Sequence, residues 1–197
     1  MNFKEILKIT LNLVLVFVFA GIVLALVYAK AEPRIVATEK LEKENALKDV
    51  VPGAANITAA GTYEPIEGKT AQYYVAKDAQ GNIIGYAADC YSKGYKSIIS
   101  ILIGTSKDMR LNSIKVLHEE ETPGLGDEID KQYFQEQYKG KAIGQLEVVK
   151  SPDPTKILAV TGATISSRAA TKGVKTGLQY LIDKYQGGVT NSEGVSK

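Results

Sequence analysis

The segment Thr70–Ser92, TAQYYVAKDAQGNIIGYAADCYS, is the clearest indication of a β-sheet in the chain. Two runs rich in tyrosine, valine, isoleucine and alanine flank the sequence DAQG at residues 78–81. Aspartate and glycine favour tight turns, and apolar runs of this length on both sides of a turn are typical of a β-hairpin. We therefore predict two antiparallel strands, over residues 70–78 and 82–92.

The residues that follow predict a second hairpin. KSIISILIGT (residues 96–105) and RLNSIKVLHEE (residues 110–120) flank SKDM, another turn-forming sequence. The run Ile98–Ile103 is almost entirely apolar, which predicts a central strand that is buried on both faces. The single cysteine, Cys90, is interpreted as a small buried apolar side chain.

Further elements complete an α+β fold, in which a mainly antiparallel sheet packs against helices. The last helix is predicted over Thr164–Tyr185, because apolar residues recur there at steps of three and four. The other elements predicted in this half are a helix over 127–140, a strand over 144–151, a turn over 151–155, a short strand over 156–160 and a flexible tail over 187–197.

The N-terminal part contains a long uncharged segment, Ile9–Ala29. Its length of about 21 residues is enough to span a bilayer as a helix. The alternative is a cleaved signal peptide, since Ala29-Lys30-Ala31 has the small-x-small form, but the apolar core is longer than such peptides use. We predict a retained membrane helix. The charges on its two flanks leave its orientation open.

The composition excludes several classes of function. Lys and Arg number 24 and Asp and Glu number 22, a balance that gives no sign of a nucleic-acid-binding surface. One cysteine and one histidine, His118, are too few for an iron–sulfur cluster and argue against a zinc site. Any redox chemistry must therefore come from an organic cofactor or from a partner.

The sequence TGATISS, Thr161–Ser167, stands at the start of the last predicted helix. Unpaired N–H groups and the helix dipole favour an anion such as a phosphate there. Gly162 and Ala163 leave room for a bulky group, and Thr161, Thr164 and two serines surround the point with hydroxyls. The alternative is an ordinary helix N-cap, because serine and threonine are favoured in that position. The sequence contains no G-x-S-x-G motif, so it gives no indication of a serine hydrolase.

The sequence HEEETPGLGDEI, residues 118–129, is a second candidate. Gly124 and Gly126 permit positive φ on either side of Leu125, so the loop could direct this side chain and backbone amides toward a ligand. Glu121 and Thr122 would add polar contacts. The alternative is a surface turn in which the glutamates face solvent and His118 is a strand-end residue.

A third candidate is YSKGYKS, residues 91–97, between the two hairpins. Gly94 and Tyr95 could place an aromatic ring beside a planar cofactor. The alternative is a plain loop between strands, with Tyr95 at its rim.

Together, GYKS, HEEETPGLGDEI and TGATISSRA behind one membrane helix resemble the G subunit of the Rnf complex. This subunit is the membrane-anchored flavoprotein of an ion-translocating ferredoxin:NAD oxidoreductase, and it is related to the C subunit of the sodium-pumping NADH:quinone reductase. The resemblance extends from the membrane helix to about residue 185. It implies an electron carrier without independent catalysis, bound to the other membrane and peripheral subunits of the complex, with its flavin domain on the extracytoplasmic side.

The resemblance also implies the cofactor and its site. A flavin transferase would attach FMN through a phosphoester to the last threonine of the motif, Thr164. The ring would lie against Glu121, Thr122 and Leu125. An aspartate is usual about six residues before the modified threonine, where this chain has Leu158. The remaining expected cofactor contacts are Tyr95, Gly124, Thr161, Gly162, Ala163, Ile165 and Ser166.

The expected organisation therefore has five parts: a leader at 1–8, a transmembrane helix at 9–29, a linker helix at 30–53, an FMN-binding domain at 54–186 and the tail. Two other functions remain open. One is the equivalent subunit of a sodium-pumping NADH:quinone reductase, and the other is an anchored module that binds an anion without redox chemistry.

Overall fold

A computed structural model describes residues 3–187 of the chain. The chain divides into two compact units, residues 1–42 and residues 43–197. The first unit, as far as it is described, is the N-terminal part of the helix α1 (Phe3–Val50). The predicted linker helix is a continuation of this same helix, which runs through Pro33 without a break. Among the described residues, α1 is the one helix long and apolar enough to cross a membrane.

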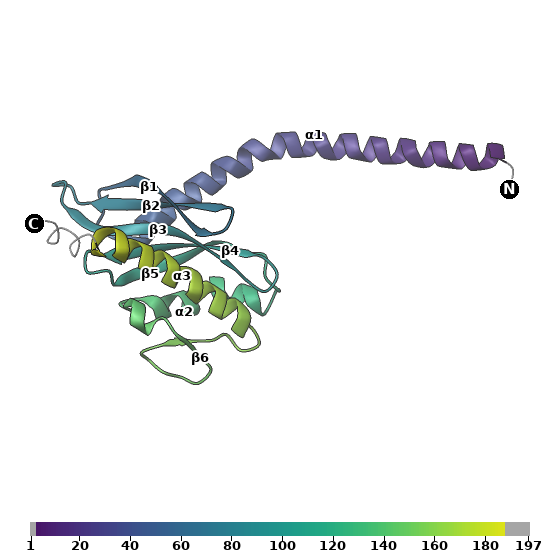
Figure 1. Cartoon of the computed structure of the whole chain (residues 1–197). Coiled ribbons are helices and arrows are strands. Elements are labelled where there is room, and N and C mark those ends of the chain that lie inside the picture. Colours follow the sequence, from purple (N-terminus) through teal and green to yellow (C-terminus); the bar gives the residue numbers. More distant parts are fainter. Residues whose placement is uncertain (1–2, 188–197) are drawn as a thin grey trace, which may run out of the picture. The chain divides into compact units, whose positions relative to one another are not determined.

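The second unit is built on a five-stranded antiparallel sheet whose strands follow one another in chain order (Figure 1). Both predicted hairpins are confirmed, with β2 paired to β3 and β4 paired to β5. The strands are β1 (Asn56–Ile66), β2 (Lys69–Lys77), β3 (Ile83–Lys93), β4 (Ile98–Ser106) and β5 (Leu111–His118).

The edge strand β1 was not predicted from the sequence. Its sequence, NITAAGTYEPI, has few large apolar residues, and most of its side chains are exposed or half-buried. The pairing with β2 also shifts register between Ala59 and Gly61. A Cβ at Gly61 would lie only 2.7 Å from the Tyr73 hydroxyl, so this glycine permits the close approach. Pairing with β2, rather than its own periodicity, makes the segment a strand.

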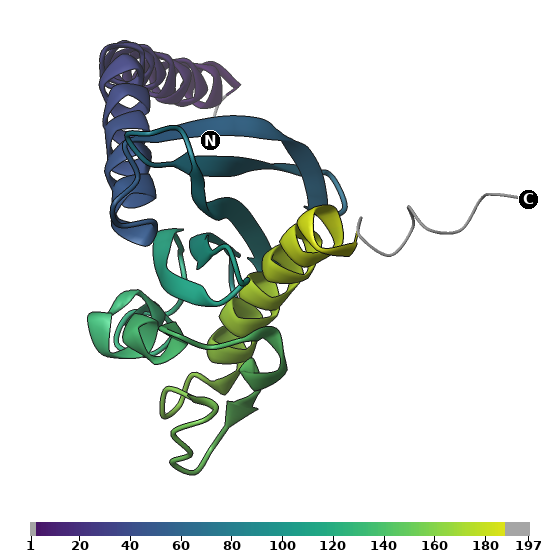
Figure 2. The same cartoon turned by 90° about the vertical axis from the view of Figure 1, so that its left-hand side faces the viewer.

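Helices cover both faces of the sheet (Figure 2). On one face, α3 (Thr164–Tyr185) packs its Val174 and Leu178 against Cys90 and Ile101. The last turns of α1 cover the opposite face, where Val50 packs beside Leu102. The predictions that β4 is buried on both faces and that Cys90 is a buried apolar residue are both confirmed.

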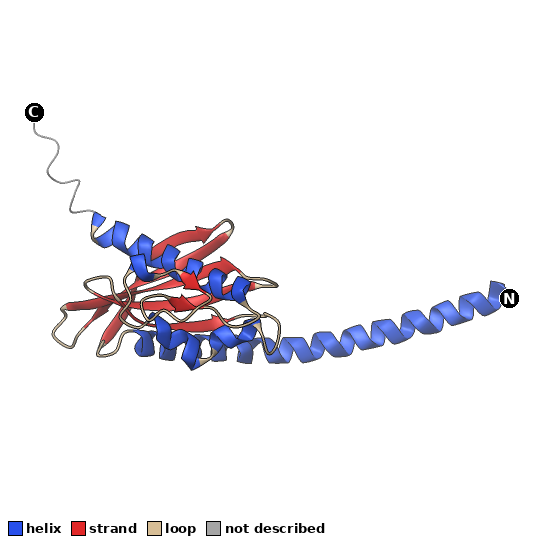
Figure 3. Ribbon diagram, turned by 90° about the horizontal axis from the view of Figure 1, so that it is seen from below, coloured by secondary structure: helices blue, strands red, loops and turns tan. Residues whose placement is uncertain are grey.

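The connection from β5 to α3 differs from the prediction of one helix over residues 127–140. Figure 3 shows a mostly irregular segment with short helical turns. Lys131 adopts an extended conformation that breaks the helix, and the buried side chains Ile129, Phe134 and Tyr138 follow an irregular spacing. The segment contains η1 (Gly126–Asp130), α2 (Gln132–Gln135), η2 (Glu136–Tyr138), η3 (Ile143–Gln145) and the parallel pair β6 (Val148–Val149) and β7 (Ile157–Leu158).

The two strands predicted in this connection are therefore much shorter than expected, with two residues each. The last helix, by contrast, has the predicted boundaries. The predicted tail falls, from residue 188 onward, outside the described residues.

Candidate cofactor site

Three segments that are distant in the sequence meet at the start of α3. They are the turn between β3 and β4 (residues 94–97), the loop after β5 (residues 119–125) and the entry to α3 (residues 161–167). A cavity of about 520 Å³ lies among them, a size within the usual range of small-molecule sites. Its lining residues are Tyr95, Thr122, Leu125, Gly126, Gly162, Ala163, Thr164, Ile165 and Ser166.

The first residue of α3 is Thr164, and the N-cap is Ala163, which forms no side-chain capping bond. The ordinary capping role is therefore not filled by a hydroxyl. The amides of Thr164, Ile165 and Ser166 belong to the first turn, whose N–H groups have no partner within the helix. Together with the positive end of the helix dipole, these groups favour an anion at this end of the cavity.

The four hydroxyls of this segment have different surroundings. The buried Ser166 donates its hydrogen bond to Glu121 Oε2 over 2.6 Å. The buried Ser167 donates to the carbonyl of Ala163 and accepts from the backbone of Val160. Thr161 is exposed and does not line the cavity. Of the four, only Thr164 both lines the cavity and has a hydroxyl without a hydrogen bond to the described residues 3–187.

Two glycines allow the motifs to touch. Gly162 has a φ of 80°, and a Cβ there would lie 2.9 Å from Leu125 Cδ2. A Cβ at Gly126 would lie 2.8 Å from Ser166 Oγ and 2.6 Å from Glu121 Cβ. The predicted positive φ is confirmed for Gly124, at 73°, but not for Gly126. A glycine is needed at 126 because a side chain there would collide with Glu121 and Ser166.

The loop after β5 presents a side chain rather than backbone amides to the cavity. The N–H groups of Leu125 and Gly126 both donate to the carbonyl of Thr122, over 3.1 and 2.9 Å. The expectation that these amides face a ligand is therefore wrong. The Leu125 side chain is partly exposed and lines the cavity.

Glu121 is buried, with 4% of its surface exposed, so the expectation of a solvated glutamate does not hold for it. Its carboxylate accepts hydrogen bonds from three successive backbone amides, those of Tyr95, Lys96 and Ser97, and from two hydroxyls. Burial alone would raise the pKa of Glu121, but the hydrogen bonds from Ser166 and the three amides outweigh it and lower the pKa to about 2. Glu121 lies behind the cavity wall and is not one of its lining residues.

The rim of the cavity is apolar and open. Tyr95 is 70% exposed, Ile165 58% and Leu125 43%. This arrangement can hold a planar apolar ring at the rim and an anion at the helix start. Of the residues predicted as cofactor contacts, Glu121, Gly124 and Thr161 do not line the cavity, and the other eight do.

The sequence prediction named Gly94 beside Tyr95, but it missed Gly126 as a lining residue and Lys96 and Ser97 as residues that hold Glu121. A Cβ at Gly94 would press on Glu121 Oε1, so the glycine before Tyr95 marked a close approach. Among residues 3–187 there is no group of three or more histidine, cysteine, aspartate or glutamate side chains that could hold a metal. His118, at the end of β5, is exposed and lies 3.7 Å from Glu120.

Lowering the pH should destabilise the second unit through Glu121. Its folded pKa of about 2 lies below the ordinary value of 4.5, so its contribution is complete above pH 4.5 and is lost as the pH falls toward 2. The difference corresponds to about 3 kcal/mol. Denaturant unfolding of the full chain from pH 6 downward, for the wild type and Glu121→Gln, should show two stability curves that converge at low pH. Parallel curves would contradict this assignment.

Comparison with known proteins adds three findings. The FMN-binding domain family matches residues 94–179, which include all three segments of the site. The chain is 34% identical over 180 residues to the G subunit of the proton-translocating ferredoxin:NAD(+) oxidoreductase complex of Clostridium ljungdahlii, with 90% of this chain and 92% of the relative covered. It is 28% identical over 187 residues to the G subunit of the ion-translocating oxidoreductase complex of Methanosarcina acetivorans, with 90% and 95% covered.

Two solved structures share the fold. NqrC from Shewanella oneidensis superposes with a TM-score of 0.51 at 24% identity, over 68% of this chain and 72% of that chain. The C subunit of the Na(+)-translocating NADH-quinone reductase from Parabacteroides distasonis also gives 0.51, at 22% identity, over 72% and 81%.

Proposed function

Because the chain belongs to the family of the G subunits of ion-translocating ferredoxin:NAD(+) oxidoreductase complexes, we propose that it carries FMN as a phosphoester on Thr164. The protein is a membrane-anchored flavoprotein that carries electrons as one part of such a complex. It has no independent catalytic activity, since its task is to hold the flavin between neighbouring carriers.

The observation that carries the assignment to Thr164 is the state of its hydroxyl. This hydroxyl lines the cavity at the first residue of α3 and has no hydrogen bond to the described residues. A phosphate joined to it would lie at the helix start, where unpaired N–H groups and the helix dipole stabilise negative charge. The neighbouring hydroxyl of Ser166 is occupied by Glu121, and Thr161 is outside the cavity.

The ring of the flavin would rest at the apolar rim. Tyr95, Leu125 and Ile165 line the cavity with large exposed side chains, and the ring would cover them. Thr122 supplies a hydroxyl at the same wall. Tyr95 could also stack on the flavin ring, which would favour a ring orientation along the rim of the cavity.

Bound FMN supplies the ability to take up two electrons and to release them singly. The ester at Thr164 would fix the cofactor in place, the start of α3 would balance its phosphate charge, and the exposed rim would leave the ring accessible to a partner. The exposed rim suits electron exchange with another carrier rather than conversion of an enclosed substrate.

The N-terminal helix supports a membrane location, and the side is inferred from the resemblance to the G subunits. The segment Ile9–Ala29 is part of α1, and its window of highest hydropathy is not buried in the protein. We infer that it crosses the membrane, that the flavin unit lies on the extracytoplasmic side, and that a flavin transferase installs the cofactor there. Its partners would be the other membrane and peripheral subunits of the complex.

The test is the intact mass of the full chain, purified from cells that supply flavin and a flavin transferase. We expect an added mass of one FMN less one water, mapped by peptide fragmentation to Thr164. After acid denaturation, yellow fluorescence should stay with the polypeptide. Release of all flavin into the supernatant would contradict the ester. A chain that never contains flavin would instead favour an anchored anion-binding module.

A further inference from the structure

We propose that Glu121 is a positioning residue that assembles the cofactor site from its three segments and places a fixed negative charge behind its wall. The proposal rests on the proposed function, because the site is taken to hold FMN. It assigns Glu121 a role through Tyr95 and Ser166 rather than a contact with the cofactor.

The contacts of the carboxylate join all three segments. Oε1 accepts from the amides of Lys96 and Ser97, each over 3.0 Å, and from the Ser97 hydroxyl over 3.2 Å. Oε2 accepts from the amide of Tyr95 over 3.0 Å and from the Ser166 hydroxyl over 2.6 Å. One side chain on the loop after β5 therefore holds both the turn between β3 and β4 and the first turn of α3.

Two glycines leave the space that Glu121 occupies. A Cβ at Gly94 would press on its Oε1, and a Cβ at Gly126 would lie 2.6 Å from its Cβ. Both glycines are adjacent to, or part of, the cavity wall. A side chain at either position would displace Glu121 and, with it, the groups that its carboxylate holds.

The chemistry of the five partners selects a carboxylate. Three are backbone N–H groups, which can only donate, and the two serine hydroxyls are also oriented as donors. An ionised carboxylate accepts at both oxygens, whereas a glutamine amide would place N–H groups against one set of donors. Hydrogen bonds to a charged group are stronger than those between neutral groups, so the loss of one is measurable.

Two consequences for the cofactor follow. Tyr95 and Ser166 both line the cavity, so releasing them would loosen the rim and the start of α3 together. The charge of Glu121 is separated from the cavity by the Ser166 hydroxyl. A negative charge so close opposes the uptake of electrons by the bound flavin, and thus keeps its reduction potential low.

The first experiment needs no flavin. Backbone hydrogen exchange of residues 95–97 is measured in the full chain without cofactor, for the wild type, Glu121→Gln and the control Glu120→Gln. Glu120 is the exposed neighbouring carboxylate, so its variant has the same change of charge. We expect exchange at residues 95–97 to accelerate about 10-fold or more in Glu121→Gln, the factor that corresponds to losing one charged hydrogen bond, and to stay unchanged in the control.

The second experiment uses the chain loaded with FMN. Glu121→Gln should raise the flavin reduction potential and make flavin fluorescence more accessible to quenching by iodide, because the charge is lost and Tyr95 is released. Ser166→Ala, which keeps the charge and removes one contact, should change quenching less and shift the potential less. Glu120→Gln should resemble the wild type.

Unchanged exchange at residues 95–97 in Glu121→Gln would overturn the proposal. Faster exchange with an unaltered potential and unaltered quenching would also overturn it, since Glu121 would then only stabilise a loop. Failure of the wild type to take up any FMN would contradict the proposed function, and the exchange result would still decide whether Glu121 holds the loop.

Discussion

Replacing Thr164 by valine is expected to remove all covalently bound FMN and to reduce electron transfer through the complex to background. Valine has nearly the shape of threonine but no oxygen that could form the ester. The side chain is half-buried at the first residue of α3, so the change should alter the free energy of unfolding by less than about 1 kcal/mol. Loss of flavin would thus reflect chemistry and not unfolding.

The matched control is Thr161→Val, in the same motif. Thr161 is exposed and does not line the cavity, so its variant should keep the adduct. Intact mass and in-gel flavin fluorescence measure both variants. An FMN adduct on the Thr164→Val chain would show that another hydroxyl carries the ester, and loss of the adduct in Thr161→Val alone would move it to Thr161.

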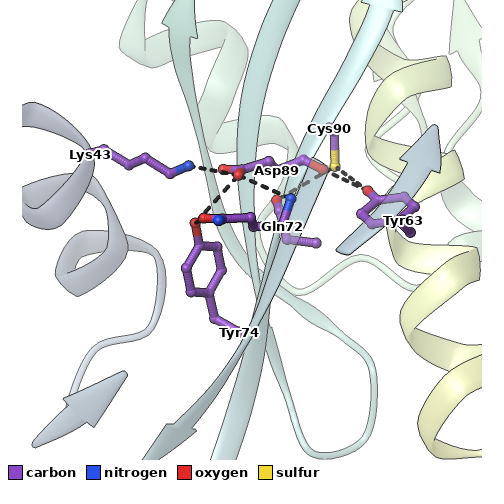
Figure 4. A network of polar contacts seen from close by, with 7 residues as sticks. Lys43, Tyr63, Gln72, Tyr74, Asp89 and Cys90 are labelled. Carbon is purple, nitrogen blue, oxygen red and sulfur yellow. Dashed lines mark hydrogen bonds and ion pairs between the residues drawn. The ribbon is translucent and has the colours of Figure 1, made fainter. Parts of the chain in front are cut away.

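Replacing Lys43 by methionine is expected to lower the free energy of unfolding of the second unit by about 3 kcal/mol. Lys43, near the end of α1, pairs with the buried Asp89 of β3 over 2.7 Å (Figure 4). Burial alone would lower the pKa of Lys43, but the hydrogen bond and charge of Asp89 raise it. Without Lys43, the Asp89 carboxylate would remain buried without a cation.

The rest of the network around Asp89 cannot replace the lysine. Its Oδ2 also accepts from the backbone of Gln72 over 3.3 Å and from the Tyr74 hydroxyl over 3.4 Å, both long bonds from neutral groups. Its Oδ1 is buried and has no hydrogen-bond partner among the described residues. The carboxylate therefore depends on Lys43 for most of its compensation, and removing one partner of a buried pair costs more than removing both.

A double-mutant cycle separates the ion pair from simple packing. Adding Asp89→Asn to Lys43→Met should restore part of the lost stability, because no charge is then left buried. Lys48→Met is the control, since Lys48 is an exposed lysine on the same stretch of α1. Denaturant unfolding of the full chain in detergent, followed by tyrosine fluorescence, measures the wild type, Lys43→Met, Asp89→Asn, the double variant and the control. A Lys43→Met chain as stable as the control would contradict the importance of this pair.

Several parts of the molecule were determined by local sequence. The two hairpins were predicted because apolar strands flank turn-forming residues, and α3 was predicted because its apolar stripe follows the helical period. The three site segments were recognised by their glycines and hydroxyls, and the structure brings them to one cavity. In each case the signal lies within a few residues along the chain, where backbone preference and side-chain periodicity act.

Other parts were decided only by tertiary structure, because their causes lie far along the chain. The buried carboxylate of Glu121 is bound by the amides of residues 95–97, up to 26 positions away, and by Ser166, 45 positions away. Asp89 is compensated by Lys43 across 46 positions. The strand β1 forms because it pairs with β2. The segment after β5 is not one continuous helix, because Phe134 and Tyr138 are placed by their packing in the core. No local pattern encodes these contacts, since the free energy that selects them arises only when the segments meet.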